Sequence, residues 1–135
     1  MQRSNLAALS GLLCALAPLA ATATTSGAPR RDVHSIIVHA ISGPSCSGGR
    51  VVYSGAPGDA ARWKRFFDGH PFLGIHYVVD RTGVVAASTP ESRTANHALD
   101  NNDGTIGIEL VHNGDGIEPF SDAQVGALIE LIKGI

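Results

Sequence analysis

The sequence has few cysteines, few aromatic residues and little charge. Two cysteines occur among 135 residues and form no CxxC pair, which excludes thiolate zinc sites and iron–sulfur clusters. Ten lysines and arginines stand against 12 acidic residues, for a net charge of −2, and no basic run occurs. Without a positive field, we expect no binding to nucleic acid. The length predicts a single domain, since a domain averages roughly 150 residues.

An apolar segment opens the chain. Arg3 is followed by the apolar run 6–20 and then by the small-residue motif Ala21-Thr22-Ala23. A charged start, a short apolar run and a small-residue motif are typical of a secretory signal. The run is short for a membrane span, which needs about 20 residues. We therefore expect a signal peptide at 1–23, a linker at 24–33, and export to the periplasm or the extracellular space, with no membrane attachment after signal cleavage.

Short apolar runs between turn residues predict the strands. They cover residues 36–41, 75–79, 84–87 and 106–111. The first run is apolar and rich in β-branched residues, which is typical of a strand buried on both faces. Asp80-Arg81-Thr82-Gly83 predicts a hairpin turn, with Gly83 at the position that favours a positive φ. Residues 42–49 are predicted as a loop, and residues 51–53 as at most a short edge strand.

Capping residues and helical spacing predict two helices. Asp59 caps a helix that runs to about Phe67. Ser121 and Gln124 form a capping box that begins the second helix. The apolar face of this helix is expected to consist of Val125, Leu128, Ile129 and Ile132. Strands and helices in this order predict an α/β domain over residues 34–135, with a mixed central β-sheet flanked by helices.

A histidine and a carboxylate on the predicted strands are the first candidates for chemistry. His39 lies near the end of its strand, before a glycine-rich loop, and is either a site residue or a core histidine bonded to a backbone carbonyl. Glu109 shares one face of its strand with Gly107 and Val111. If that face is buried, desolvation raises the pKa of Glu109 toward the range of a general base. If the face is exposed, Glu109 is an ordinary solvated charge.

The other histidines carry weaker signals. His97 follows small and polar residues, and either lines a groove or is an ordinary loop histidine. His76 alternates with apolar neighbours and is expected to face one side of the sheet. His34, His70 and His112 adjoin turn residues and are expected at the surface.

Five segments, in one order, resemble the zinc-dependent N-acetylmuramoyl-L-alanine amidases, a group related to phage lysozyme-type amidases and peptidoglycan recognition proteins. They are Ile37-Val38-His39-Ala40-Ile41-Ser42, Ile75-His76-Tyr77-Val78-Val79-Asp80-Arg81-Thr82-Gly83, Asn96-His97-Ala98, Thr105-Ile106-Gly107-Ile108-Glu109-Leu110 and Phe120-Ser121-Asp122-Ala123-Gln124. The resemblance implies a peptidoglycan-recognition/amidase-like fold. It also implies hydrolysis of the amide bond between N-acetylmuramic acid and the L-alanine of the stem peptide.

The resemblance assigns roles to residues of this chain. His39 is implied to be the first zinc ligand, and Glu109 the general base that takes a proton from zinc-bound water. His97 and Asn96 are implied to line the substrate groove, and His76 to lie in the sheet behind the site. The implied cofactor, Zn²⁺, lowers the pKa of a bound water to about 7. The implied partner is peptidoglycan or a muropeptide. We expect the protein to be a monomer.

One part of the family pattern is missing. The family takes its second and third zinc ligands from a stretch after the last helix, with a Gly-His segment and then an Asp or Cys near Pro-Gly. The sequence ends at Ile135, before such a stretch, and a catalytic zinc site needs about three protein ligands. We therefore expect a family member whose C-terminal part is missing. The alternatives to an active amidase are a non-catalytic module that binds peptidoglycan or muropeptides, and an inactive fragment.

Overall fold

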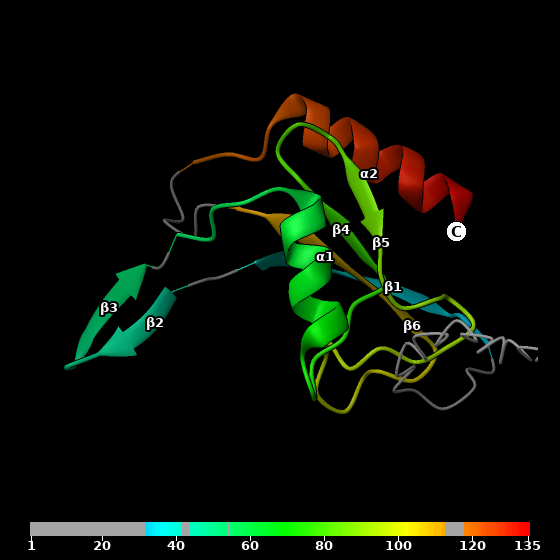
Figure 1. Ribbon diagram of the computed structural model, residues 1–135, viewed down its shortest axis with the longest axis horizontal. Helices are drawn as coiled ribbons and strands as arrows, with labels where there is room; N and C mark the ends of the chain where they lie inside the picture. Colours follow the sequence, from blue (N-terminus) through cyan, green and yellow to red (C-terminus); the bar gives the residue numbers. More distant parts are fainter. Residues whose placement is uncertain (1–31, 42–43, 54, 113–117) are drawn as a thin grey trace, which may run out of the picture.

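The computed structural model describes residues 32–41, 44–53, 55–112 and 118–135 (Figure 1). The expected signal peptide and most of the expected linker lie outside the described residues. Over the described ranges, no helix combines the length and the apolar composition that crossing a membrane requires.

A four-stranded mixed sheet forms the centre of the domain (Figure 1). Its strands lie in the order β1 (Ser35–Ile41), β6 (Thr105–Val111), β4 (Tyr77–Val79) and β5 (Val85–Ala87). β6 pairs parallel with β1 and with β4, and β4 pairs antiparallel with β5. Because β6 has a neighbour on each side, nearly all of its residues are buried. The predicted α/β architecture with a mixed sheet is confirmed.

The two helices pack on opposite faces of this sheet. Alternation along β6 turns Ile106, Ile108 and Leu110 toward α2 (Asp122–Gly134), where they form one core with Leu128 and Leu131 of the helix. The other core lies on the side of α1 (Ala60–Gly69) and consists of Ile41, Ala56, Ala60, Ile75, Val78 and Val111, with Trp63 and Phe67 packed against them. The α1 side is therefore the face to which Gly107 and Glu109 belong.

Both predicted helix caps are present. The Asp59 carboxylate accepts a hydrogen bond from Arg62 N at 2.7 Å, and the Ser121 hydroxyl accepts one from Gln124 N at 3.2 Å. The Gln124 side chain does not complete a capping box, because its Nε2 donates to the carbonyls of Val79 and Val111 at 2.9 and 3.0 Å. Gln124 thus ties the start of α2 to the ends of β4 and β6.

The predicted apolar face of α2 is only partly correct. Leu128 packs on the sheet as expected, together with Ala127, Leu131 and Ile135. Three residues of the predicted face, Val125, Ile129 and Ile132, are instead 38 to 47% exposed. Helical spacing groups apolar residues into a stripe, but α2 carries more than one such stripe. The packing against the sheet decides which of them is buried.

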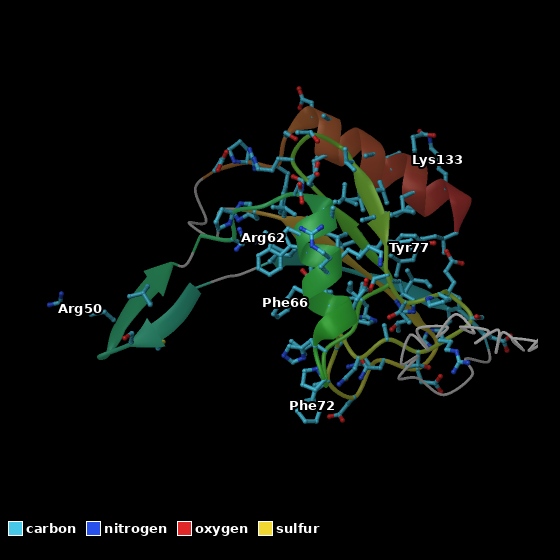
Figure 2. All side chains as sticks on the ribbon, viewed as in Figure 1. Arg50, Arg62, Phe66, Phe72, Tyr77 and Lys133 are labelled. Atoms are coloured by element: carbon cyan, nitrogen blue, oxygen red, sulfur yellow. The ribbon has the colours of Figure 1, made fainter. Side chains whose placement is uncertain are left out.

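Two strand predictions are wrong. β1 is not buried on both faces, since it lies at the edge of the described sheet and Val38 is 43% exposed. The predicted loop 42–49 contains β2 (Pro44–Ser47), which pairs antiparallel with β3 (Arg50–Tyr53) in a separate hairpin. Gly48 and Gly49 form its two-residue turn with φ values of 57° and 73°, the backbone of a type I′ hairpin. The hairpin projects away from the four-stranded sheet, with Arg50 near its far end (Figures 1 and 2).

The predicted hairpin turn between β4 and β5 is confirmed and is held by the Asp80 carboxylate. This carboxylate accepts hydrogen bonds from Thr82 N, Thr82 Oγ1 and Val84 N, and also from Ala60 N at the start of α1. Burial acts to raise the pKa of Asp80, but hydrogen bonds from Thr82, Ala60 and Val84 outweigh it and hold the pKa below its ordinary value. Gly83 adopts a φ of 86°.

Asp80→Ala is expected to lower the free energy of unfolding by about 3 kcal/mol, because it leaves buried donors at the turn and at α1 without an acceptor. Urea unfolding of the chain measures this change. The exposed Asp103→Ala variant is the control, with an expected change within about 0.5 kcal/mol. Because the pKa of Asp80 is lowered, its contribution is present above the ordinary pKa and is lost as the pH falls below it. Equal losses in both variants would contradict this role.

Candidate active site

The candidate site lies where β1 and β6 run side by side. Their parallel register places His39 beside Glu109 and Ile37 beside Gly107. Paired positions in neighbouring strands project from the same face of a sheet. His39 and Glu109 therefore lie together on the α1 side, although the sequence separates them by most of the domain.

Glu109 is half-buried in the centre of the sheet. On the α1 face it lies between His39 of β1 and Val78 of β4. Its Oε2 atom is inaccessible to solvent and has no hydrogen-bond partner among the described residues. Burial raises the pKa of Glu109 to about 7. Of the two sequence-based alternatives for Glu109, the structure supports the desolvated carboxyl.

The imidazole of His97 fills the space that Gly107 leaves. A Cβ atom built on Gly107 would lie 2.5 to 2.7 Å from three ring atoms of His97, closer than any side-chain contact allows. His97 Nδ1 lies 3.0 Å from His39 Nε2, with the rings edge to face. The sequence placed Gly107 on the same strand face as Glu109, and in the structure the His97 ring occupies the space above Gly107. His97 therefore belongs to the site rather than to an isolated loop.

Burial keeps both of these imidazoles neutral. It lowers the pKa of His97 to about 4, with smaller contributions from His39 and His76. It also lowers the pKa of His39. At neutral pH the site therefore holds uncharged histidines beside a carboxyl group whose pKa lies near 7. A general base requires such a carboxyl, because a pKa close to the working pH allows it to accept and then return a proton.

His76 is a buried histidine that directly precedes β4 and lies behind the site. It is fully buried and its ring centre lies 5.8 Å from that of His97. Gly107 N donates to its Nδ1 at 2.9 Å, and its Nε2 lies 2.9 Å from Arg93 O. His76 thus fixes the backbone of Gly107, on which His97 rests.

Asparagines hold the loop that carries His97. Asn102 Oδ1 accepts hydrogen bonds from His97 N at 2.9 Å and from Ala98 N at 2.7 Å. Asn102 Nδ2 donates to Asn96 Oδ1 at 2.8 Å, and Asn96 Nδ2 donates to Phe72 O at 2.6 Å. Asn96, expected to line the substrate groove, is an exposed residue whose side chain joins two loops. Asn102 was not singled out from the sequence, where its one signal is the Asn/Asp turn cluster.

The remaining histidines lie outside this site. His34 is exposed, and His70 follows α1, where its Nδ1 accepts from Leu73 N at 2.8 Å. The expectation of a surface position is wrong for His112, which is 9% exposed. Its Nε2 lies 2.8 Å from Glu118 O and its ring contacts Phe120. The segment just before α2 contacts His112 through Glu118 and Phe120. The position of His112 near a turn in the sequence does not predict this contact.

The described residues do not by themselves provide a complete metal centre. Within them, no group of three or more His, Cys, Asp or Glu residues lies close enough to hold a metal ion. His39 is adjacent to His97 and Glu109, but His97 directs its Nδ1 at His39. A catalytic zinc needs about three protein ligands. The donor set in the described part of the chain does not fit that requirement.

Comparison with known proteins agrees with this fold. The profile of a family described as N-acetylmuramoyl-L-alanine amidase matches residues 29–135. No curated protein sequence matches the chain.

Solved structures share the architecture at low sequence identity. The N-acetylmuramoyl-L-alanine amidase LysC from Clostridium intestinale aligns with a TM-score of 0.52 and 20% identity, over 76% of this chain and 62% of that one. The endolysin amidase LysCS from the same organism aligns at 0.51 and 20%, over 76% and 60%. The peptidoglycan recognition protein SD from Drosophila aligns at 0.54 and 20%, over 80% and 64%. The chain thus spans less than two thirds of the length of these structures.

Proposed function

Because the chain belongs to the N-acetylmuramoyl-L-alanine amidase family, we propose that it hydrolyses the amide bond between N-acetylmuramic acid and the L-alanine of the peptidoglycan stem peptide. The observation that carries this proposal is the half-buried Glu109, whose pKa is raised to about 7 beside His39. Neutral water is a weak nucleophile toward an amide. A base with a pKa near 7 accepts a proton from the water as its oxygen attacks the carbonyl carbon.

The proton transfers of this reaction are assigned to Glu109. Its carboxylate accepts a proton from a water molecule as the water oxygen attacks the amide carbonyl carbon. The same carboxyl group then donates that proton to the nitrogen of L-alanine as the C–N bond breaks. The products are the lactyl carboxylic acid and a free amine, so the carboxylate is regenerated. His39 is the residue that the resemblance implies as a ligand of Zn²⁺, but the described donor set is too small to hold that ion.

We also propose that the protein is exported. Residues 1–23 have the features of a secretory signal, and peptidoglycan lies outside the cytoplasmic membrane. We therefore place the substrate and the proposed site in the same compartment, the periplasm or the extracellular space.

Binding without hydrolysis is the second candidate function. It is favoured by the described donor set, in which His39 lacks two further ligands. One structural neighbour is named as a peptidoglycan recognition protein rather than as an amidase. In this case His97 and Asn96 would contact a muropeptide while Glu109 would have no catalytic role.

An assay on purified sacculi distinguishes hydrolysis from binding without hydrolysis. The chain is incubated with sacculi, which are then pelleted, and the supernatant is analysed for stem peptides that begin with a free L-alanine amine. We expect such peptides from the unchanged chain and none from His39→Ala. His34→Ala changes an exposed histidine outside the site and serves as the matched control, with release expected as for the unchanged chain. A chain that pellets with sacculi but releases no peptide would contradict hydrolysis and support the binding function.

A further inference from the structure

A chain of hydrogen bonds runs through the site from a backbone turn to His39. It begins at the carbonyls of Asn101 and Asn102, to which Thr105 Oγ1 lies at 2.8 and 3.1 Å. It continues from Thr105 Oγ1 to His97 Nε2 at 3.1 Å, and from His97 Nδ1 to His39 Nε2 at 3.0 Å. Most of these groups are buried or half-buried, so water does not readily replace the contacts.

The hydrogen bond from Thr105 to the backbone determines which atom donates in each of the others. A backbone carbonyl only accepts, so the single hydroxyl proton of Thr105 is directed at the carbonyls of Asn101 and Asn102. The Thr105 oxygen must then accept from His97, which places the His97 proton on Nε2. In a neutral imidazole the other nitrogen is an acceptor. His97 Nδ1 therefore accepts, and His39 Nε2 must donate to it.

We propose that Thr105 and His97 are positioning residues that hold His39 in the tautomer with its proton on Nε2, so that the free electron pair of His39 lies on Nδ1. The proton on one imidazole nitrogen decides which nitrogen can bind an electrophile or accept a proton. The catalytic use of Nδ1 rests on the proposed function, whereas the tautomer itself does not.

The surroundings of His97 keep this arrangement in one geometry. Gly107 leaves room for the ring, and a Cβ atom there would lie 2.5 Å from it. Asn102 holds the backbone of His97 through a hydrogen bond of 2.9 Å. His76 contacts the ring from the side and is itself bound to Gly107 N. A ring held on these sides cannot turn over, a movement that would put ring carbons where Nδ1 and Nε2 make their hydrogen bonds.

Nuclear magnetic resonance of the full chain labelled with ¹⁵N-histidine tests the proposal. Spectra at about pH 8 avoid charged imidazoles, since the ordinary histidine pKa is about 6.5. We expect His39 and His97 both to carry the proton on Nε2, and a nitrogen–nitrogen coupling across the hydrogen bond from His39 Nε2 to His97 Nδ1. A proton on His39 Nδ1 would overturn the proposal.

Two substitutions of Thr105 form a matched pair. Thr105→Ser keeps the hydroxyl and is expected to keep the coupling and both tautomers. Thr105→Val keeps the shape but removes the acceptor for His97 Nε2, so we expect loss of the coupling and a mixture of tautomers at His39. His76 is the internal reporter of folding, because Gly107 N and Arg93 O hold its tautomer independently. An unchanged His39 spectrum in Thr105→Val, with His76 intact, would overturn the proposal.

His97→Ala is the second variant, in case Thr105→Val does not fold. It removes the acceptor of His39 Nε2 directly, and the Nε2 proton is expected to exchange rapidly with water. Retention of a slowly exchanging proton would contradict the role of His97. The spectra test the positioning role, and the assay on sacculi tests hydrolysis, so the two proposals can fail independently. The predicted tautomer without peptide release would refute the proposed hydrolysis alone, whereas peptide release with the opposite tautomer would refute the positioning role alone.

Discussion

Gly107→Ala is expected to lower the free energy of unfolding by about 1–3 kcal/mol, the usual cost of adding a methyl group where no space exists. The new Cβ would lie 2.5 to 2.7 Å from three atoms of the His97 ring. The ring cannot retreat without losing its hydrogen bonds to His39 and Thr105. We therefore expect the substitution also to abolish the His39–His97 contact. Urea unfolding measures the first effect and the histidine spectra measure the second.

Gly126→Ala is the matched control for this substitution. Gly126 lies inside α2, and a Cβ atom built on it meets no atom within 4 Å. Alanine is favoured over glycine in a helix, so this variant is expected to be more stable by roughly 0.5–1 kcal/mol. Replacing glycine by alanine is thus expected to destabilise the protein at Gly107 and to stabilise it at Gly126. A Gly107→Ala variant as stable as the unchanged chain would show that His97 does not rest on Gly107.

Glu109→Gln is expected to abolish peptide release from sacculi and, at about pH 8, to raise the free energy of unfolding by about 2–3 kcal/mol. The folded-state pKa of Glu109 is about 7, above its ordinary value of 4.5. The folded protein therefore binds the proton more tightly than the unfolded chain does. The unchanged chain is expected to lose stability as the pH rises from about 4.5 to about 7, and to lose no more above that range.

Glutamine at this position keeps the shape of the side chain but has no proton to release. Unfolding of Glu109→Gln is therefore expected to show a smaller pH dependence between about pH 4.5 and pH 7 than unfolding of the unchanged chain. Glu130→Gln, which changes a side chain that is 74% exposed on α2, is the control and should leave the pH dependence unchanged. Parallel curves for the unchanged chain and Glu109→Gln would mean that Glu109 is solvated in the folded protein.

Activity and stability should respond to pH in opposite directions. Peptide release requires the carboxylate form of Glu109, so the rate is expected to rise as the pH increases through about 7. Stability falls over the lower part of the same range, because the charged form is the one that burial disfavours. The same desolvation therefore destabilises the folded protein and gives Glu109 the pKa of a base. The rate of peptide release from sacculi, followed across this pH range, measures the first effect.

Local signals in the sequence predicted much of the scaffold. Strand alternation in 106–111 assigned Glu109 and Gly107 to one face, and the structure confirms it. The turn at Asp80 and the caps at Asp59 and Ser121 are also confirmed, since each depends on side chains within a few residues. The same kind of signal was present in Gly48-Gly49, a typical hairpin turn, but the short polar run before it obscured the strand.

The residues of the site were predicted individually, but their contacts were not. His39 and His97 are separated by 58 positions, and their rings meet only because β1 and β6 are neighbours and loop 96–102 folds over Gly107. Thr105, Asn102 and His76 support the site through contacts of the same kind. His112 was predicted at the surface, and tertiary contacts bury it.

By itself the sequence determined which residues are apolar, which face of a strand each side chain takes and where the chain turns, because these properties depend on neighbours along the backbone. The order of the strands, the position of β1 at the edge, the buried face of α2 and the pairing of His39 with His97 were decided by the tertiary structure. These features depend on which distant segments pack together, and the periodicity of a single segment does not specify its partner. The raised pKa of Glu109 was also decided by the tertiary structure, since its desolvation requires the segments that pack on the α1 side of the sheet.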